Sequence, residues 1–390
     1  MKTSEPPAPN RRTLFLLSAG HFMNDAYPGY LAPLLPLLIQ KLGFSLTLAG
    51  ALVSIQAIAT SLMQPLFGWI SDHLRRPILV IAGPLLTALF FSMIGLTTSW
   101  LQTAGVIVLG GLGTAAFHPQ AASLAGRVSG QHKGLGMSIF VTAGSAGHAL
   151  GPIFILSVVT WLGLGYSWLT VFAGAAVAAL LWRLLPATLT PAQSLPVQVP
   201  AARRGGRKEL LIVIWLIVFI RAFVIDGFMA FNPLYLHQKQ FSVMLAGAAN
   251  TIFELSGATG TLLGGPISDR FGRKNMVLFS LVAPIPFFWL FLHTQGVGAL
   301  VYLALAGFIL FSSVPVTIIM AQELFPNRSG AVSSLTMGFA WGVAGLLVTP
   351  FGALSDKIGL SQSLQWLMVL LPIALSLVLW LPNKKMDRHE

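Results

Sequence analysis

The chain of 390 residues is 55% hydrophobic and only 9% charged, with a mean hydropathy of +0.79, whereas an ordinary soluble domain is about 25% charged. This composition excludes a soluble domain and predicts a protein that crosses a membrane many times. The net charge of +12 would suggest a nucleic-acid partner on a folded surface, but the basic residues fall in short loops between apolar runs, as topology signals do. With no Cys, the chain has no disulfide framework and no thiolate metal site.

Twelve apolar runs predict twelve membrane-spanning helices, because about 20 apolar residues cross the hydrocarbon of a bilayer. The first run is too long for the core of a signal peptide and is expected to remain as the first span. The stretch after the sixth run is rich in Pro, Ala, Gln and Arg, which predicts a mobile linker. The runs lie at about 13–39, 48–71, 77–97, 101–127, 134–160, 165–185, 210–237, 243–268, 275–293, 296–322, 329–355 and 362–382.

The distribution of Lys and Arg sets the predicted orientation. With a cytoplasmic N-terminus, nineteen of the 23 basic residues lie in the cytoplasm; Lys41, Lys239 and Lys357 fall outside, and Arg221 lies within a span. Basic loops resist translocation, so both termini are predicted to be cytoplasmic. The predicted organisation is a cytoplasmic tail at 1–12, a six-helix bundle at 13–185, a cytoplasmic linker at 186–208, a second bundle at 209–382 and a tail at 383–390.

One motif occurs twice, at matching places in the two halves. Gly68-Trp-Ile-Ser-Asp72-His-Leu-Arg75-Arg76-Pro77 follows the second span, and Gly265-Pro-Ile-Ser-Asp269-Arg-Phe-Gly272-Arg273-Lys274 follows the eighth. A Leu-Ala-Gly triplet stands at the same distance before each copy, ending at Gly50 and Gly247. The fold class is therefore predicted to be an all-α membrane protein of two similar six-helix bundles, with a substrate site between them.

The doubled motif, the twelve spans and the central linker resemble the major facilitator superfamily across essentially the whole chain. Asp72 and Asp269 lie near helix ends beside arginines, so each is expected to pair with those arginines and with a neighbouring helix N-terminus, latching the cytoplasmic side. Glu323-Leu-Phe-Pro326, after the tenth span, resembles a loop signature of the family. The gating candidates are Asp72, Arg75, Arg76, Asp269, Arg273, Lys274, Glu323 and Arg328.

Two further segments sharpen the resemblance. Gly144-Ser-Ala-Gly147-His148-Ala-Leu-Gly151-Pro152 resembles the Gly-Pro signature of exporters that exchange substrate for protons, although small residues at this spacing also allow close helix packing alone. His21-x-x-Asn24-Asp25, leading into Leu34-Leu35-Pro36, and Gly113-Thr-Ala-Ala-Phe117-His118-Pro119 resemble the fosmidomycin-resistance branch. This branch implies inner-membrane drug efflux driven by the proton gradient. The packing candidates are Gly144, Gly147, Gly151 and Pro152.

Asp25 lies inside the first apolar run, where a charged side chain costs about 2.5–3.5 kcal/mol on insertion scales. His21 precedes Asp25 by four residues, so the two side chains share one helix face and can meet. Asp25 is therefore a candidate carrier of a coupling proton, with His21 tuning its affinity. The alternative is a polar pair that only holds this helix against a neighbour.

Three charged residues stand out in the second half. Arg221 is the only basic residue inside a span, and its guanidinium suits a phosphonate or carboxylate, or else it neutralises a fixed acid. Asp226 follows it by five residues, about 140° around an ideal helix, so the two should not pair; Asp226 roughly mirrors Asp25 in the repeat. Glu254 lies near the middle of the eighth span, as a proton carrier or as the counter-ion of Arg221. The proton-coupling candidates are Asp25, Glu254, Asp226 and His21.

The remaining candidates are polar residues of the first half. His118 and His148 lie in Gly-rich spans and either contact substrate or only pack, and the side chains near Asp25 are candidates to line the same cavity. The acidic and His residues show no convincing metal spacing, and no nucleotide-binding loop is found, so no metal, cofactor or nucleic acid is expected. The substrate-binding candidates are Asn24, Tyr27, Tyr30, His118, His148 and Arg221.

The sequence thus predicts a secondary active transporter of the inner membrane that works as a monomer by alternating access. It is expected to export a small drug-like or anionic molecule, such as a phosphonate antibiotic, by antiport with protons. A proton-coupled metabolite or sugar importer is an open alternative, because the motif resemblance fixes direction poorly. A membrane sensor that keeps the fold without transport is a second. No nucleophile and base set is recognisable, so the protein is not expected to be an enzyme.

Overall fold

The computed structural model describes residues 10–44, 46–74, 76–185, 207–241 and 243–382. Over these residues the chain is helical and contains no strand, because backbone polar groups in hydrocarbon must be satisfied within their own segment. The all-α fold class is confirmed. The predicted linker lies outside the described residues except for Arg207 and Lys208, and so do Arg75 and most of both predicted tails.

The chain forms two compact units. Unit 1 holds the described residues of Met1–Gln131, Ile139–Ser194 and Phe325–Phe339, and unit 2 holds those of His132–Ser138, Leu195–Leu324 and Ala340–Glu390. Each unit therefore includes a short segment from the other half of the chain.

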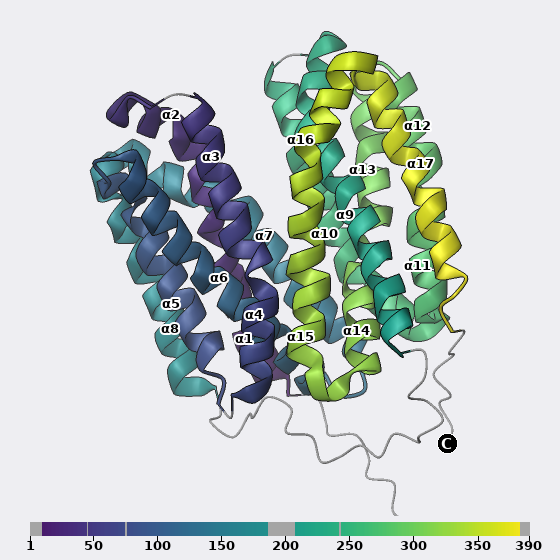
Figure 1. The fold of residues 1–390 in the computed structure, drawn as a ribbon, viewed down its shortest axis with the longest axis horizontal. Coiled ribbons are helices and arrows are strands. Elements are labelled where there is room, and N and C mark those ends of the chain that lie inside the picture. Colours follow the sequence, from purple (N-terminus) through teal and green to yellow (C-terminus); the bar gives the residue numbers. More distant parts are fainter. Residues whose placement is uncertain (1–9, 45, 75, 186–206, 242, 383–390) are drawn as a thin grey trace, which may run out of the picture. The chain divides into compact units, whose positions relative to one another are not determined.

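Unit 1 is a bundle in which α1 and α5 pack against each other and against both α6 and α8 (Figure 1). Most of α7 belongs to it, and its short segment from the second half forms the start of the eleventh predicted span. Its helices are α1 (Arg11–Ala26), η1 (Pro28–Tyr30), α2 (Leu31–Leu42), α3 (Leu46–Ala57), η2 (Ile58–Leu62), α4 (Gln64–His73), α5 (Ile78–Ser92), η3 (Met93–Leu96), α6 (Trp100–Val128), α7 (Lys133–Leu162), η4 (Leu164–Thr170), α8 (Val171–Leu184), η6 (Pro326–Arg328), α15 (Ser329–Ser334) and η7 (Leu335–Phe339).

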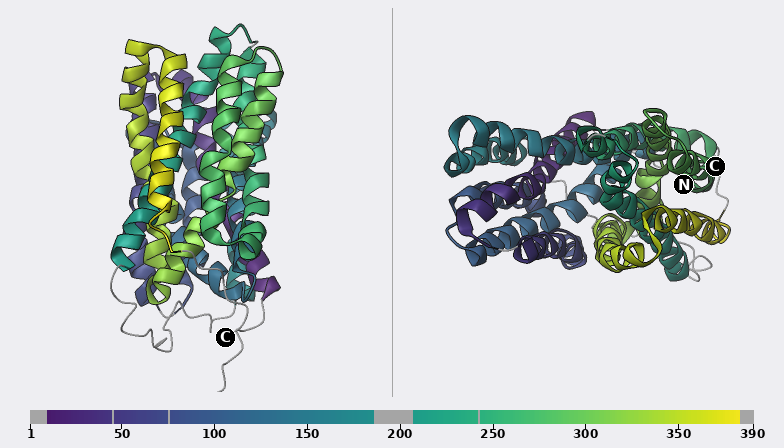
Figure 2. Two further views of the ribbon diagram at one scale, coloured as in Figure 1. Left: turned by 90° about the vertical axis from the view of Figure 1, so that its right-hand side faces the viewer. Right: turned by 90° about the horizontal axis from the view of Figure 1, so that it is seen from above.

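Unit 2 is a second bundle, in which α9 packs against α10, α14, α16 and α17 (Figure 2). Its core contains stacked aromatic rings, with the centroids of Phe228 and Phe288 4.1 Å apart. Its helices are α9 (Arg207–Gln238), α10 (Val243–Phe271), α11 (Arg273–Val282), α12 (Pro284–His293), α13 (Gly298–Phe311), α14 (Val314–Leu324), α16 (Ala340–Ile358) and α17 (Leu360–Val378).

Ten helices among the described residues are long and apolar enough to cross a membrane. The other two predicted spans correspond to α1 with α2, which η1 joins, and to α10. Pro28 and Gly29 follow the end of α1 and interrupt the first span soon after Asp25. The described chain therefore contains a helical segment for every predicted span.

The second copy of the repeated motif turns at a glycine. Gly272, at the start of α11, has a φ of +94°, which favours glycine. Counted from the repeated aspartates, Arg75 stands at the matching place in the first copy and lies outside the described residues. Leu74, just before it, has an extended backbone with a φ of −80°.

Candidate functional site

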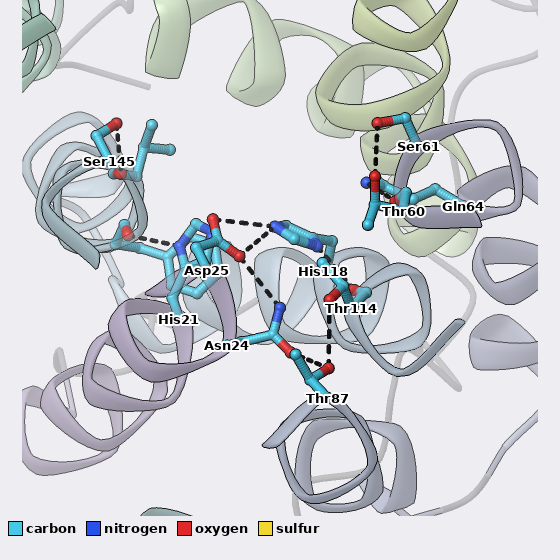
Figure 3. Close-up of polar contacts among 12 residues, drawn as sticks. His21, Asn24, Asp25, Thr60, Ser61, Gln64, Thr87, Thr114, His118 and Ser145 are labelled. Carbon is cyan, nitrogen blue, oxygen red and sulfur yellow. Dashed lines mark hydrogen bonds and ion pairs between the residues drawn. The ribbon is translucent and has the colours of Figure 1, made fainter. Parts of the chain in front are cut away.

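His21, Asp25 and His118 form one cluster inside unit 1, with the Asp25 carboxylate between the two imidazoles (Figure 3). The Nε2 atom of His21 lies 3.1 Å from Oδ2 of Asp25, and the Nε2 atom of His118 lies 3.1 Å from Oδ1. The side chains of His21 and His118 are only 3% and 10% exposed, while that of Asp25 is 19% exposed. Asp25 therefore has two imidazole partners, one on its own helix and one on α6.

Backbone carbonyl oxygens hold the other nitrogen of each ring. Nδ1 of His21 lies 2.7 Å from the carbonyl oxygen of Phe140, and Nδ1 of His118 lies 2.8 Å from that of Thr114. A carbonyl oxygen only accepts hydrogen bonds, so each Nδ1 carries the proton that it donates. This arrangement points both Nε2 atoms at Asp25.

A chain of polar side chains links the cluster to α5. Asn24 donates from Nδ2 to Oδ1 of Asp25 at 3.1 Å, and its Oδ1 accepts from the hydroxyl of Thr87 at 3.1 Å. The Thr87 hydroxyl also lies 3.2 Å from that of Thr114 on α6 (Figure 3). Asn24 is fully buried, so it orients the carboxylate from inside the bundle.

Glycines of α7 make room for this arrangement. A Cβ atom at Gly144 would collide with the imidazole of His21, and Cβ atoms at Gly147 and Gly151 would collide with the backbone of α1 at Phe22 and Ala26. The Gly-Pro segment therefore brings α7 against the helix that carries Asp25. The exposed His148 lies on α7 between these glycines.

Tyr27 and Tyr30 lie in the apolar core of unit 1 and are fully buried. The hydroxyl of Tyr27 donates to the carbonyl oxygen of Thr170 at 2.7 Å and accepts from the backbone N–H of Gly174 at 2.9 Å. Tyr27 therefore ties α1 to the start of α8. The structure gives both rings packing contacts where the sequence predicted a cavity lining.

Arg221 is the most deeply buried cation among the described residues of unit 2, with 1% of its surface exposed. It donates from Nη1 to the hydroxyl of Ser313 at 2.6 Å and from Nη2 to that of Thr317 at 3.1 Å. Ser280 donates to the Ser313 hydroxyl at 2.6 Å. Among the described residues no carboxylate contacts Arg221, and its Nε has no hydrogen-bond partner.

The two acidic candidates of unit 2 lie on α9 and α10. Asp226, on α9 like Arg221, is half-buried and forms no ion pair within the described part of the chain. Glu254 is half-buried on α10.

The repeated aspartates cap helix starts. Oδ1 and Oδ2 of Asp72 accept from the backbone N–H groups of Gly330 and Ala331, at 3.0 and 3.1 Å, at the start of α15 in unit 1. Oδ2 of Asp269 accepts from the N–H of Gly134 at 3.0 Å, at the start of α7 in unit 2. A carboxylate at a helix start satisfies free N–H groups and interacts favourably with the helix dipole.

The first glycine of each motif permits these caps. A Cβ atom at Gly68 would meet the backbone of Gly330 and the hydroxyl of Ser334. At Gly265 it would collide with the backbone of Gly134 and the hydroxyl of Ser138. The spacing of glycine and aspartate thus combines a close helix approach with a cap one turn later.

The basic gating candidates have several different surroundings. Arg273 forms an ion pair with Glu323. Lys274 donates to the carbonyl oxygens of Leu379 and Leu381 at 3.1 and 2.6 Å and so caps the end of α17. Arg76 and Arg328 are exposed.

The three donor atoms of the His21–Asp25–His118 cluster lie within 4.8 Å of one another, a spacing that would also suit a metal ion. The Nε2–carboxylate contacts of 3.1 Å have the length of hydrogen bonds. The same geometry makes the cluster a candidate site for protons. Sequence spacing misses it because His118 lies 93 residues from Asp25.

Comparison with known proteins identifies the family. The family model described as Major Facilitator Superfamily matches residues 14–349. The chain belongs to this superfamily. It is 31% identical over 362 residues to an uncharacterized MFS-type transporter of Bacillus subtilis, YfnC, covering 90% of this chain and 88% of that protein. It is 27% identical over 385 residues to the fosmidomycin resistance protein of Escherichia coli, covering 96% and 93%.

Solved structures share the fold at low sequence identity. The human organic anion transporter MFSD10 superposes with a TM-score of 0.76 at 18% identity, over 95% of this chain and 100% of that one. The outward conformation of the MFS transporter FucP also gives 0.76, at 15% identity, over 95% and 99%. The protein is thus a multi-pass membrane transporter of small molecules and not an enzyme, and the resemblance inferred from the doubled motif is confirmed.

Proposed function

We propose that this transporter exports a small drug-like or anionic molecule, such as a phosphonate antibiotic, in exchange for protons. The observation that carries the proposal is the His21–Asp25–His118 cluster, in which an acid inside a membrane helix contacts two imidazoles at 3.1 Å. Ionisable residues within membrane spans are rare and mark ion and proton pathways. In this proposal Asp25 and His21 are members of the proton-coupling site.

Two observations support export. The Gly144–Pro152 segment resembles the signature of proton-exchanging exporters, and its glycines pack against the helix of Asp25. The relative in Escherichia coli, which aligns with 96% of this chain, is named a fosmidomycin resistance protein. Removal of a drug from the cell is the transport direction that gives resistance.

Arg221 supports an anionic substrate group. Its guanidinium is buried with hydroxyl partners and has no described carboxylate. A planar guanidinium binds phosphonate or carboxylate oxygens in a bidentate fork. Asp226 and Glu254 are the further acids of this half that are candidates for proton coupling.

The helix caps of Asp72 and Asp269 act as gates in this proposal. Asp72, in the first half of the sequence, accepts from the start of α15 in the second half. Asp269, in the second half, accepts from the start of α7 in the first half. Breaking these hydrogen bonds releases the helix start, and alternating access requires such a reversible contact. Arg273 with Glu323 adds an ion pair to the second gate.

The proposed setting is the inner membrane, with both termini in the cytoplasm. The basic loops support this orientation through the positive-inside rule. A monomer in the lipid bilayer is sufficient, because one chain supplies both bundles.

The test is transport of fosmidomycin by the purified protein in liposomes with an imposed pH gradient. We expect net fosmidomycin flux in the direction opposite to the flow of protons down their gradient. This flux should be lost in Asp25→Asn. Gly105→Ala is the control, because a Cβ atom there meets nothing within 4 Å. Flux that ignores the gradient and persists in both Asp25→Asn and Glu254→Gln would contradict proton coupling.

Direction needs a separate measurement. Cells that make the protein are compared for growth with fosmidomycin and for uptake of labelled metabolites, including sugars. Protection against the drug supports export. Accumulation of a nutrient without protection would favour the importer, and binding without any flux would favour a sensor.

A further inference from the structure

Four histidines of the described chain donate from Nδ1 to a backbone carbonyl oxygen. In His73, His118 and His293 the acceptor lies four residues earlier on the same helix, and in His21 it is Phe140 on α7. Only His21 and His118 also bring Nε2 within 3.1 Å of a carboxylate. These two rings share the Nδ1–H form, so their Nε2 atoms are the ones that gain and lose protons.

This geometry determines how many protons the cluster needs. Without protons on Nε2, each ring turns a lone pair toward an ionised carboxylate, and both contacts are repulsive. One proton repairs one contact and leaves the other unsatisfied. Two protons, one on each Nε2, make both contacts favourable, because each imidazolium then donates to Asp25.

We propose that His118 is a member of the proton-coupling site and that the cluster loads and releases two protons in each transport cycle. This inference rests on the proposed function for its part in transport, and it identifies a third residue and a stoichiometry. The filled cluster carries a net charge of +1, from two imidazolium ions and one carboxylate. The empty cluster carries −1.

The surroundings suit a cluster that changes its charge. Asn24 keeps a hydrogen bond on Oδ1 of Asp25, and the 19% exposure of Asp25 leaves access for protons. The His21 ring stacks on Phe140 at 4.2 Å and meets the His118 ring edge-on at 5.0 Å.

Few other titratable groups lie on the helices around the cluster. No described side chain other than His21, His118 and Asn24 forms a hydrogen bond or ion pair with Asp25. The helix α5 has no ionisable residue. The ionisable residues on the other elements packed against α1 are Arg127 and His118 on α6, Arg183 on α8, Lys133 and His148 on α7, and Tyr30 on η1.

The first test measures protonation without any substrate. The full-length protein is labelled with 15N-histidine in lipid nanodiscs, and its signals are assigned with His21→Gln, His118→Gln and His293→Gln. We expect both nitrogens of His21 and of His118 to be protonated in acid. Both Nε2 signals should then lose their protons over a shared pH interval, leaving Nδ1–H rings.

Asp25→Asn removes the charge that holds both protons. In this variant His21 and His118 should both become neutral at a pH where they are protonated in the original protein, while His293 stays unchanged. His293 is the matched control because its Nδ1 also donates to a carbonyl oxygen, 2.7 Å away, without a described carboxylate partner. A His118 signal that ignores Asp25→Asn, or a neutral Nε2–H ring at either position, would overturn the proposal.

The second test counts protons in transport. Liposomes at zero membrane potential, with a pH difference of one unit, are allowed to reach a steady gradient of fosmidomycin, corrected for the charge of the probe. Two protons per cycle support about a 100-fold gradient and one supports about tenfold, because each proton contributes about 1.4 kcal/mol per pH unit. We expect about 100-fold, falling to tenfold in His118→Gln.

A tenfold gradient in the original protein would overturn the two-proton stoichiometry. Absence of fosmidomycin flux would count against the proposed function and leave the histidine measurement as the test of the cluster. The two failures are therefore distinguishable.

Discussion

Two buried polar networks occupy corresponding places in the repeat but differ in charge. Asn24 stands 48 residues before Asp72, and Arg221 stands 48 residues before Asp269. In unit 1 the Asn24 network runs through hydroxyls of α5 and α6 and ends at an internal carboxylate. In unit 2 the Arg221 network runs through the hydroxyls of Ser313, Thr317 and Ser280 and reaches no described carboxylate.

Both networks use hydroxyl groups of neighbouring helices, but the hydroxyls stand at different positions of the repeat and the networks carry different charges. Unit 1 holds its own anion with two imidazoles, the arrangement that we propose as the proton site. Unit 2 holds a cation without a described carboxylate partner, which we propose to bind an anionic substrate group. The proposed division of labour assigns protons to one network and substrate to the other.

The largest expected effect comes from removing the anion of unit 1. Asp25→Asn should lower gradient-driven flux of fosmidomycin at least about 100-fold, which corresponds to roughly 2.7 kcal/mol. Exchange of labelled for unlabelled fosmidomycin across liposomes without a gradient should persist, because it needs no net proton release. Loss of exchange and net flux together in a folded variant would mean that Asp25 serves more than protons.

Removing the cation of unit 2 should separate function from stability. Arg221→Gln should weaken fosmidomycin transport about tenfold, or roughly 1.4 kcal/mol, mainly by raising KM. The midpoint of thermal unfolding in detergent should stay or rise, because a buried cation that has hydroxyl partners but no described carboxylate partner is destabilising.

Asn24→Ala is the matched variant in unit 1. It should lower the unfolding midpoint, because it removes the two hydrogen bonds of Asn24, to Asp25 and to Thr87. Such hydrogen bonds contribute about 0.5–1.5 kcal/mol each. If Arg221→Gln destabilises the protein as much as Asn24→Ala and leaves KM unchanged, Arg221 is a structural residue and the contrast between the networks fails.

The gates should respond alike in the two units. Gly68→Ala and Gly265→Ala should each reduce transport several-fold, because forcing a methyl group into a close helix contact costs about 1–3 kcal/mol. Gly105→Ala, which adds its methyl group to open space, should transport normally. A defect in only one of the two gate variants would show that the repeat is asymmetric at its caps as well.

The smallest effect is expected at the end of α17. Lys274→Met removes hydrogen bonds to the carbonyl oxygens of Leu379 and Leu381 and should lower stability by about 0.3–1 kcal/mol. Arg76→Met, which alters an exposed side chain in unit 1, should leave the unfolding midpoint unchanged. A larger loss for Arg76→Met would place an important contact on that side chain.

Hydropathy and the doubled motif were sufficient to predict the fold, because membrane helices must satisfy their own backbone hydrogen bonds. The contact of His21 with Asp25 also follows from sequence, since residues four apart share a helix face. The contact with His118 does not, because it depends on how α6 rotates against α1. The pattern of small residues in both helices permits several such rotations.

Asn24 and Arg221 stand at matching positions of the repeat, but the sequence does not suggest the match because one side chain is neutral and the other is charged. Matching by charge favours Asp25 with Asp226, although that pairing requires a gap, whereas counting from the repeated aspartates needs none. The hydroxyls of Ser313, Thr317 and Ser280 were missed because serines and threonines are common in membrane helices. Tyr27 and Tyr30 were assigned to a cavity lining, and only packing reveals that they belong to the core.

The hydrogen bonds from both Nδ1 atoms to carbonyl oxygens affect whether protons can leak across the membrane through these two rings. An imidazole that passes protons along a wire receives one at one nitrogen and releases one from the other. In His21 and His118 the second nitrogen is occupied by a donated hydrogen bond, so a proton must depart from the same Nε2 at which it arrived. In the proposed proton site, neither ring therefore relays protons through its own two nitrogens, and a change in which side of the membrane reaches the cluster lets the protons continue.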